Sequence, residues 1–293
     1  MTKTTNEIRL TVVVDNTANP NLISEHGFSL WIESNEQTVL FDTGQGPAFK
    51  ENVHRLNIDI SKTDTIVLSH GHYDHTGGLP YALSMAQSAR LFAHPDVSIP
   101  RYSVSDNVAR SIAMTQISHE AMIWHPVDTT WTTSPTLIAD NMGVTGKIPR
   151  QTNYEDTGGP FFVNETGSHP DLIEDDMALW LRTECGLVVV AGCCHAGIIN
   201  TLRYALEISG ESHLHAVIGG FHLVNASKQR MEKTVKDLRL LNPDILIPCH
   251  CTGQAAIEKL EHEFPSSIKP CLAGSVFRFP VTGNGKNVKL LLQ

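Results

Sequence analysis

The stretch TIVLSHGHYDHTGGLP at residues 65–80 places four side chains that can ligate metals directly after an apolar run. The run is typical of a short strand that is buried on both faces. In the turn that follows, His70 and His72 can point the same way and bind one ion, while Asp74 and His75 can turn toward a second. Imidazoles combined with a carboxylate suit Zn²⁺, Fe or Mn, and two such ions would share and activate a water.

Polar side chains also follow other predicted strands, at the points where these strands end. The clusters are Gly192-Cys193-Cys194-His195, Gly219-Gly220-Phe221-His222 and Pro248-Cys249-His250, and His94 follows a strand in the same manner. The carboxyl ends of strands are where α/β proteins place their ligand sites. The repeated arrangement therefore predicts that several of these segments complete the site begun in the first stretch.

The order of predicted elements indicates an α/β fold. Hydrophobic runs bounded by turn residues predict strands at 8–15, 28–34, 37–44, 64–69, 89–95, 213–220 and 244–250, and two more that flank Glu184-Cys185-Gly186. Helical patterns lie at 47–57, 77–87, 197–209, 226–241 and 254–263. Two mixed sheets, each covered by helices, would form a four-layer α/β/β/α sandwich. We expect residues 1–293 to form a single domain.

Residues 95–170 differ from the rest of the chain, because they are rich in Ser, Thr, Pro, Asn and Gly and have weak periodicity. A long irregular stretch within a compact domain is usually functional, so an inserted cap or lid is expected here. Its aromatic residues argue against disorder; they are Trp124, Trp131, Tyr154, Phe161 and Phe162. They would either wall a pocket over the metals or form a small core of the cap itself.

The overall composition fits a globular protein that acts on a small molecule. The 293 residues carry a formal charge of −9 and no long Lys/Arg run, which argues against nucleic acid as a partner. No apolar stretch approaches the roughly 20 residues that span a bilayer, and the start MTKTTNEIRL lacks the apolar region of a signal peptide. The six cysteines include an adjacent pair and suit reduced thiols better than a disulfide framework, so a cytoplasmic location is expected.

The motif in SHGHYDHTGG matches H-x-H-x-D-H, and the chain here resembles the metallo-β-lactamase superfamily. VLFDTG resembles the superfamily segment whose aspartate, here Asp42, would orient the histidine loop. GCCHAGIIN, GGFHL, PCHCTG and TGKIPR together resemble the subgroup typified by archaeal dihydropterin–ribofuranosylaminobenzene phosphate synthases. The resemblance covers nearly the whole chain. It implies the α/β/β/α fold and one or two metal ions, most often zinc, without implying a single reaction.

Ligand roles follow from the resemblance residue by residue. The four side chains of the first motif would be metal ligands, and Asp74 would also hold and orient the attacking water. His250, after the last core strand, would be a further ligand. Where the superfamily places a bridging aspartate, this chain has Gly-Cys-Cys-His, so we expect His195 to ligate there, with Cys193 as the competitor.

One superfamily histidine has no obvious counterpart, and Asp175 and Asp176 fall closest to its position. Whether Asp175, Asp176 or Cys193 is a ligand stays open at this point. His94 and His222 are candidates to support the ligands or to face the substrate. Arg150, in TGKIPR, is a candidate to bind an anionic and perhaps aromatic substrate through its guanidinium fork.

Three functions compete for this constellation. The first is a metal-dependent hydrolase that directs a metal-activated water at an ester-like or phosphoester substrate. The second, implied by the subgroup, is a dihydropterin-type synthase or transferase that displaces a diphosphate. The third is iron-based redox chemistry on the same ligands, although no flavodoxin-like partner domain is present.

Overall fold

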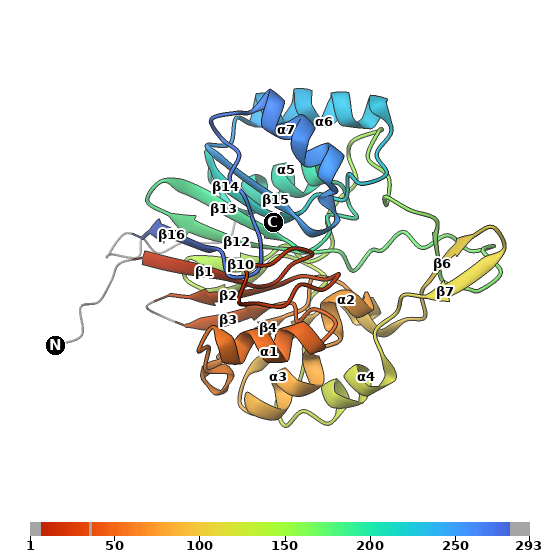
Figure 1. The fold of residues 1–293 in the computed structure, drawn as a ribbon, viewed down its shortest axis with the longest axis vertical. Helices are drawn as coiled ribbons and strands as arrows, with labels where there is room; N and C mark the ends of the chain where they lie inside the picture. The colour runs from red at the N-terminus through yellow and green to blue at the C-terminus, as the bar shows by residue number, and fades with distance from the viewer. Residues whose placement is uncertain (1–6, 35–36, 282–293) are drawn as a thin grey trace.

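The computed structural model describes residues 7–34 and 37–281. Two β-sheets lie face to face at its centre, with helices on both outer sides (Figure 1). The first sheet has the strand order β16-β1-β2-β3-β4-β5-β8. Its strands are β1 (Glu7–Val14), β2 (Ser29–Glu33), β3 (Thr38–Phe41), β4 (Thr65–Val67), β5 (Arg90–Ala93), β8 (Thr130–Trp131) and β16 (Val276–Pro280).

The second sheet has the order β15-β14-β13-β12-β10-β9. Its strands are β9 (Thr136–Ala139), β10 (Met142–Val144), β12 (Ala178–Thr183), β13 (Gly186–Ala191), β14 (Leu214–Gly220) and β15 (Ile245–Cys249). The hairpin expected around Glu184-Cys185-Gly186 is confirmed, because β12 and β13 pair antiparallel across it. The remaining β13–β14 and β14–β15 pairs are parallel, so the carboxyl ends of these three strands meet at one edge.

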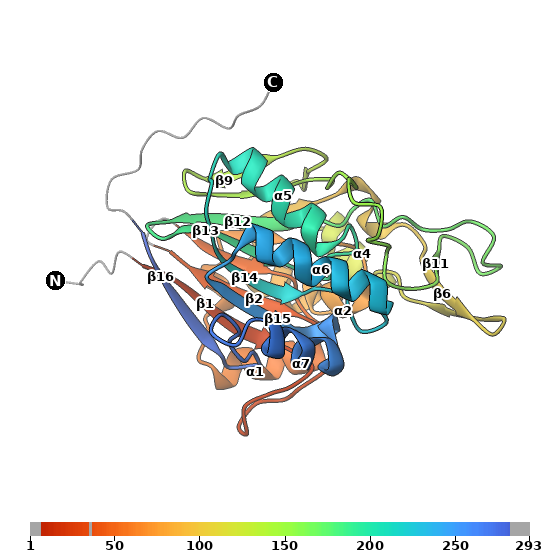
Figure 2. The same cartoon turned by 90° about the horizontal axis from the view of Figure 1, so that it is seen from above.

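Helices cover the two outer faces, and the four-layer prediction is confirmed. Below the first sheet lie α1 (Pro47–Arg55), α3 (Leu79–Met85) and α4 (Gln116–Ile123), while α5 (Ile198–Ser209), α6 (Lys228–Leu241) and α7 (Gln254–Glu263) cover the second (Figures 1 and 2). One buried core lies between the sheets and holds side chains of both, such as Leu30 and Val190. Two further cores join each sheet to its helices, around Leu40 and Phe49 and around Trp180 and Leu202.

The stretch 95–170 contains more regular structure than its sequence predicts. Strand β8 joins the first sheet, and β9 and β10 join the second. The strands β6 (Tyr102–Ser105), β7 (Val108–Ser111) and β11 (Phe161–Phe162) form a separate three-stranded sheet, which projects from the sandwich in both ribbon views. These strands are only two to four residues long, so their hydrophobic alternation is too short to read in the sequence.

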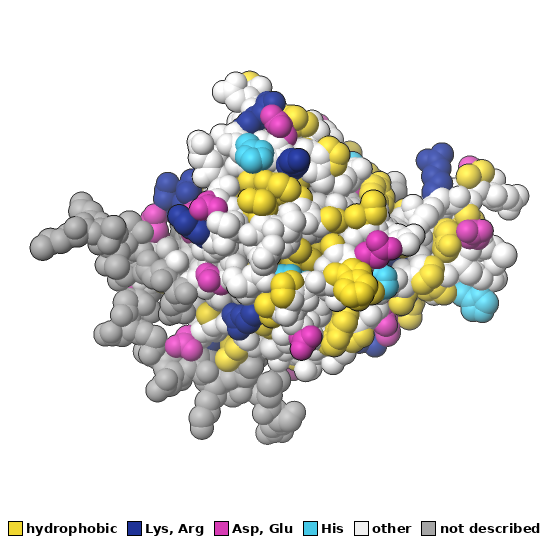
Figure 3. Space-filling model, turned by 90° about the horizontal axis from the view of Figure 1, so that it is seen from below, with side chains coloured by type: hydrophobic (Ala, Val, Ile, Leu, Met, Phe, Trp, Pro, Cys, Tyr) yellow, Lys and Arg dark blue, Asp and Glu magenta, His cyan; other side chains and the backbone are white. Residues whose placement is uncertain are grey.

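Two of the aromatic side chains in this stretch face solvent. Trp124, after α4, is 81% exposed, and Trp131 is 52% exposed. Figure 3 shows apolar side chains grouped on part of the face that carries the α1, α3 and α4 layer. Trp124 and Trp131 therefore belong to the surface, whereas Phe161 lies against the histidines described below. Within the described ranges, no helix is both long and apolar enough to cross a membrane.

Candidate metal centre

The first histidine motif begins in the turn after β4, with His70 and His72, and continues into a short helix, α2 (Tyr73–Thr76), which carries Asp74 and His75. His72 precedes this helix, and the chain turns sharply at Gly71. A Cβ atom on Gly71 would lie 1.9 Å from the carbonyl oxygen of Val97, so only glycine fits at this position. The Gly71 amide donates to Asp175 Oδ2 at 2.8 Å, which fixes the turn from behind.

One group of donors consists of His70, His72 and His195, whose ligand atoms all lie within 4.8 Å of one another. The ring centroids are 4.5 to 4.9 Å apart. All three Nε2 atoms are buried and have no hydrogen-bond partner. A buried polar atom without a partner costs free energy, so three of them together indicate a site that a cation would satisfy.

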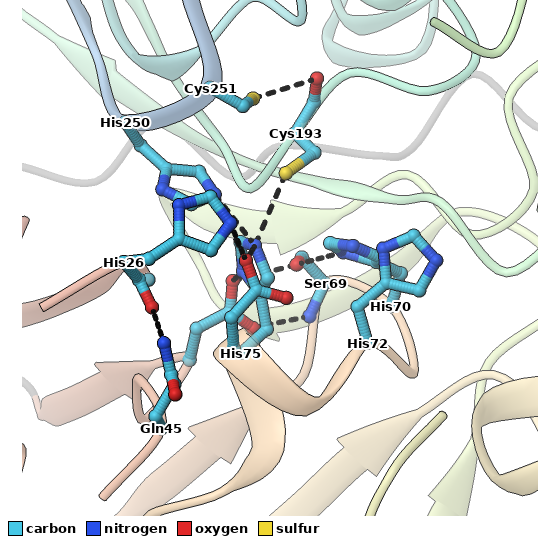
Figure 4. Close-up of polar contacts among 12 residues, drawn as sticks. His26, Gln45, Ser69, His70, His72, His75, Cys193, His250 and Cys251 are labelled. Carbon is cyan, nitrogen blue, oxygen red and sulfur yellow. Dashed lines mark hydrogen bonds and ion pairs between the residues drawn. The ribbon is translucent and has the colours of Figure 1, made fainter. Parts of the chain in front are cut away.

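A second group lies beside the first and contains Asp74, His75 and His250 (Figure 4). His75 Nε2 and His250 Nε2 are 3.2 Å apart. Asp74 Oδ2 lies 3.8 Å from His75 Nε2 and 3.5 Å from His250 Nε2. The motif of the first sheet therefore meets a histidine from the end of β15, as the sequence predicts.

The outer hydrogen bonds of these imidazoles determine which nitrogen faces the centre. Asp42 accepts from the Ser69 hydroxyl at 2.6 Å and from His75 Nδ1 at 2.7 Å. Because the Ser69 hydroxyl uses its proton in the hydrogen bond to Asp42, the Ser69 oxygen accepts a hydrogen bond from His70 Nδ1 at 2.9 Å. His70 and His75 thus carry protons on Nδ1, which leaves their Nε2 atoms to face inward.

His195 and His250 are oriented in the same way by other partners. His195 Nδ1 donates to the carbonyl oxygen of Thr157 at 2.8 Å. Asn16 Oδ1 accepts from the Gly27 amide, so it also accepts from His250 Nδ1 at 2.9 Å. Such outer partners are the usual companions of metal-binding imidazoles.

Two thiols lie between the donor groups. Cys193 Sγ is 3.2 Å from His75 Nε2, and the Cys251 thiol donates to the Cys193 carbonyl oxygen at 3.7 Å (Figure 4). The ligand atoms of Cys193, His250 and Cys251 also lie within 4.8 Å of one another. Burial raises the pKa of the Cys193 thiol. Burial would also raise the pKa of Cys251, but the Cys193 thiol and the imidazoles of His222 and His250 outweigh it and lower that pKa.

His222 lies closer to the donors than the sequence suggests. Its ring centroid is 4.3 Å from that of His195, and its ligand atom falls within 4.8 Å of those of Cys193 and His195. Phe161 contacts the same region, with ring centroids 5.5 Å from His72, 5.4 Å from His195 and 5.9 Å from His222. The projecting three-stranded sheet thus brings one aromatic ring onto the histidines.

The two aspartates considered as replacement ligands have other partners. Both carboxylate oxygens of Asp175 bind the Arg101 guanidinium at 2.7 Å, in a fully buried ion pair. Asp176 Oδ2 accepts from the Ala196 amide at 2.7 Å, and burial raises its pKa to about 7. Asp175 therefore supports the first motif, and Asp176 supports the turn that carries His195.

His94 and Arg150 have contacts outside the histidine cluster. His94 Nδ1 accepts from the Asp96 amide at 3.1 Å and caps a short 3₁₀ turn, Pro95–Ser98. Arg150 is exposed and donates to the carbonyl oxygen of Leu172 at 2.5 Å. Neither hydrogen bond brings these side chains to the donors.

Burial and charge set the proton affinities of the centre. Burial holds the pKa values of His70, His72 and His195 well below the usual 6.5. Burial would lower the pKa of His75 as well, but the carboxylates of Asp42 and Asp74 outweigh it and raise the pKa to about 9. Burial also opposes ionisation of Asp74, yet the neighbouring imidazoles lower its pKa overall. The His75 region thus attracts a cation, be it a proton or a metal ion.

Backbone strain is concentrated at the same strand ends. Asp42, Cys194, His222 and His250 all have positive φ angles between 45° and 57°. Non-glycine residues rarely adopt this conformation, and it is found where function requires a particular side-chain direction. The sequence does not mark these positions, because Asp and His adopt a positive φ more often than most residues but still only in a small minority of cases.

Two side chains at the centre are absent from the sequence-based ligand set. His26, in the loop before β2, donates through Nε2 to Asp74 Oδ2 at 3.2 Å. The second is Cys251, for which the sequence predicts only a reduced thiol. The spacing Cys-His-Cys around His250 could have identified Cys251, whereas no local pattern marks His26.

The donor set fits one or two transition-metal ions. Imidazole nitrogens with one carboxylate and neighbouring thiols suit Zn²⁺ or Fe, and the Nε2 atoms without partners point to a shared centre. The architecture and the histidine edge together define a protein of the metallo-β-lactamase fold.

Comparison with known proteins agrees. The Metallo-beta-lactamase superfamily model matches residues 24–95. The 7,8-dihydropterin-6-methyl-4-(beta-D-ribofuranosyl)-aminobenzene-5'-phosphate synthase of Methanocaldococcus jannaschii is 31% identical over 268 residues, which cover 87% of this chain and 90% of that protein. This chain therefore belongs to the metallo-β-lactamase superfamily, and its resemblance to the subgroup of that synthase is confirmed.

Two further relatives extend over nearly the whole chain. Uncharacterized protein MJ0448 of the same archaeon is 33% identical over 253 residues, with 85% of this chain and 92% of that protein covered. The crystal structure of Tm1679, described as a metal-dependent hydrolase of the β-lactamase superfamily, has a TM-score of 0.79 at 34% identity. It covers 92% of this chain and 98% of its own.

Proposed function

We propose that this protein is a metal-dependent hydrolase that cleaves an ester-like or phosphoester bond in a small anionic molecule. Two adjacent donor groups support the proposal. In the first, the Nε2 atoms of His70, His72 and His195 are buried without a partner, and in the second, the Nε2 atoms of His75 and His250 face each other at 3.2 Å. Outer hydrogen bonds orient the imidazoles of His70, His75, His195 and His250, so little reorganisation of these four is needed to bind a cation.

In this proposal His70, His72 and His195 hold one ion, and Asp74, His75 and His250 hold the second. Cys193, at 3.2 Å from His75 Nε2, lies where a bridging aspartate stands in the superfamily and competes as a ligand. Bound zinc, iron or manganese would polarise the substrate oxygen and lower the pKa of a water.

Asp74 is the residue we assign to the reaction itself. Its Oδ2 can hold and orient a water against the substrate, and it accepts from His26 at 3.2 Å. The Asp74 carboxylate raises the pKa of His26, and burial only partly opposes this. Because the His26 side chain is 55% exposed, it can exchange the proton that Asp74 handles with solvent.

We assign the projecting sheet of β6, β7 and β11 the role of a cap. The Phe161 ring lies within 5.9 Å of three site imidazoles, centroid to centroid, and its side chain is only partly buried. A planar group of a substrate could stack on this ring while its anionic end reaches the ions. Arg150 is a candidate contact for the anionic end of the substrate, provided that its guanidinium gives up the hydrogen bond to the Leu172 carbonyl oxygen.

A synthase is the second candidate, favoured by the relative that bears that name and by the aromatic ring at the site. In this reaction an aromatic amine or carbon would attack a dihydropterin carbon, and the C–O bond to a diphosphate would break. Release of diphosphate that depends on both substrates would support it. Iron-based redox chemistry is the third candidate, and metal analysis of protein from its own host tests it.

The proposal is tested with full-chain protein loaded separately with Zn²⁺, Mn²⁺ or Fe²⁺. Panels of carboxylic esters, lactones, thioesters and phosphodiesters are followed by mass spectrometry of the products. We expect turnover of at least one class, loss of that turnover in Asp74→Asn, and retention in His262→Ala, which changes an exposed histidine on α7. Silence of all three loaded forms on every class would refute the hydrolase.

A further inference from the structure

A second cluster of metal-ligating side chains lies at the opposite edge of the second sheet. His213 Nε2 and His215 Nδ1 both lie 2.8 Å from the same oxygen, Asp244 Oδ2. The three residues stand at the starts of β14 and β15, whereas the donors described above follow the ends of these strands. At about 3.3 Å per residue, the length of β14 separates the two positions by roughly 15–20 Å.

The sheet positions this cluster before any ion arrives. Strands β14 and β15 are parallel neighbours, with Ala216 beside Ile245. The Asp244 amide donates to the Leu214 carbonyl oxygen at 3.3 Å, which brings the aspartate between the two histidines. His213 directly precedes β14 and His215 is its second residue, and both side chains reach the same oxygen of Asp244.

Each imidazole is also packed in place. The His213 ring lies against Gly186, where a Cβ atom would approach its Cδ2 to 2.8 Å. The ring centroid of His215 is 5.7 Å from that of Phe279, and its side chain is 15% exposed. His213 and Asp244 are 46% and 43% exposed, so an ion can enter from solvent. A preset geometry with open access is what a binding site at a protein surface requires.

We propose that His213, His215 and Asp244 form a second site for a divalent transition-metal ion, independent of the catalytic centre. Two imidazole nitrogens and one carboxylate oxygen suit Zn²⁺, Cu²⁺ or Ni²⁺, and they do not suit Mg²⁺ or Ca²⁺, which prefer oxygen ligands. In the metal-free site, His213 Nε2 and His215 Nδ1 carry the protons that they donate to Asp244 Oδ2. To bind the ion, each imidazole would take the tautomer that is protonated on its other ring nitrogen, so that the nitrogen facing Asp244 offers a lone pair. Solvent completes the coordination.

The ionised state of Asp244 favours this site. The hydrogen bond from His215, together with that from His213, lowers the pKa of the Asp244 carboxyl, and burial opposes this only slightly. The carboxylate can therefore neutralise part of the ion's charge. A bound ion would link the start of β14 to the start of β15, and we expect it to stabilise the folded protein without affecting turnover.

Zinc binding by the full chain tests this proposal. Metal-free wild type is titrated with Zn²⁺ by calorimetry, beside His213→Ala and Asp244→Asn. Asp244→Asn keeps a side chain of the same size, so it guards against simple loss of folding at this corner. We expect both variants to bind one equivalent fewer than wild type while keeping its turnover, and His262→Ala to match wild type.

Equal stoichiometry and affinity in wild type, His213→Ala and Asp244→Asn would overturn the site. So would saturation of the extra equivalent only at roughly millimolar zinc, which would indicate an adventitious ion. Once the main centre has been filled with Zn²⁺, one added equivalent of Cu²⁺ provides a second readout, because two coordinated imidazoles give nitrogen hyperfine structure in its paramagnetic resonance spectrum. Loss of that signal in His213→Ala is expected, and its persistence would contradict the assignment.

Discussion

The two ends of the second sheet carry similar residues in contrasting surroundings. At the carboxyl ends of its strands, His195 meets His70 and His72 of the first sheet, and all three are buried with Nε2 atoms that have no hydrogen-bond partner. At the amino ends, His213 and His215 bind Asp244 directly, and the side chains of His213 and Asp244 are nearly half exposed to solvent. A buried donor without a partner destabilises the protein until an ion arrives, whereas an exposed and paired donor costs little. Residue types alone therefore do not define a catalytic centre; burial and unmet hydrogen bonds distinguish it.

The largest contrast is expected from alanine at one histidine of each edge. His70→Ala removes a donor from the first group, so the protein should lose one bound ion and turnover should fall by more than about 100-fold, since even outer partners of metal ligands contribute about 10–100-fold. His213→Ala should leave turnover unchanged. Elemental analysis and steady-state kinetics on folded, purified variants measure both. Full metal content in His70→Ala would remove that residue from the ligand set.

Aspartates of the two edges should differ in their effect on stability. Asp175→Ala leaves the buried Arg101 guanidinium with Asp171 as its remaining ion pair and removes the acceptor of the Gly71 amide. We expect a loss of about 3 kcal/mol in the free energy of unfolding. In the metal-free protein, Asp244→Ala breaks only exposed pairs and should cost about 1 kcal/mol or less. Urea unfolding of the metal-free proteins checks this, and comparable losses would contradict the comparison.

The pH dependence of the metal-free protein should come mainly from the buried edge. The pKa of His75 is raised from 6.5 to about 9, so its stabilisation is complete below pH 6.5 and is lost as the pH rises toward 9. This shift corresponds to about 3 kcal/mol. The lowered pKa values of His70, His72 and His195 act on the other side, because their stabilisation is lost as the pH falls below 6.5.

Metal-free protein should therefore be most stable near pH 6.5 to 7, with losses in both directions. A bound ion takes the place of the His75 proton, so the loss between pH 7 and 9 should be much smaller in zinc-loaded protein. Thermal unfolding across this range, with and without chelator, measures the difference. His213→Ala should show the wild-type profile, and a flat profile in chelated wild type would be inconsistent with this account of His75.

The smallest effect concerns the cap. Phe161→Ala removes a ring that contacts three site imidazoles but no part of the fold's main cores. We expect KM for a planar substrate to rise about tenfold with metal content unchanged, because an aromatic contact contributes on the order of 1 kcal/mol beyond its burial. Phe161→Leu should lie in between. An unchanged KM in both variants would remove the cap from substrate binding.

The sequence predicts most of the sandwich because its core strands are apolar runs with clear ends. The runs that became β4, β13 and β14 are confirmed to within a few residues, as are α5 and α7. The strands within 95–170 are not predicted because each is only two to four residues long, and because β8, β10 and β11 pair with strands far away in the sequence. Local periodicity carries no information about such pairing.

The residues of the candidate centre likewise fall into those that the sequence marks and those that only the tertiary structure reveals. His70, His72, Asp74 and His75 are marked by their spacing in one turn, and His195 and His250 by the strands that precede them. Only the tertiary structure places His26 on Asp74, brings Cys251 to Cys193, and assigns Asp175 to Arg101. These contacts join residues far apart in the chain, and they depend on how the two sheets face each other. The sequence by itself determined which side chains can hold a metal; the packing of the sheets decided which of them meet, because distance and burial arise only in the folded chain.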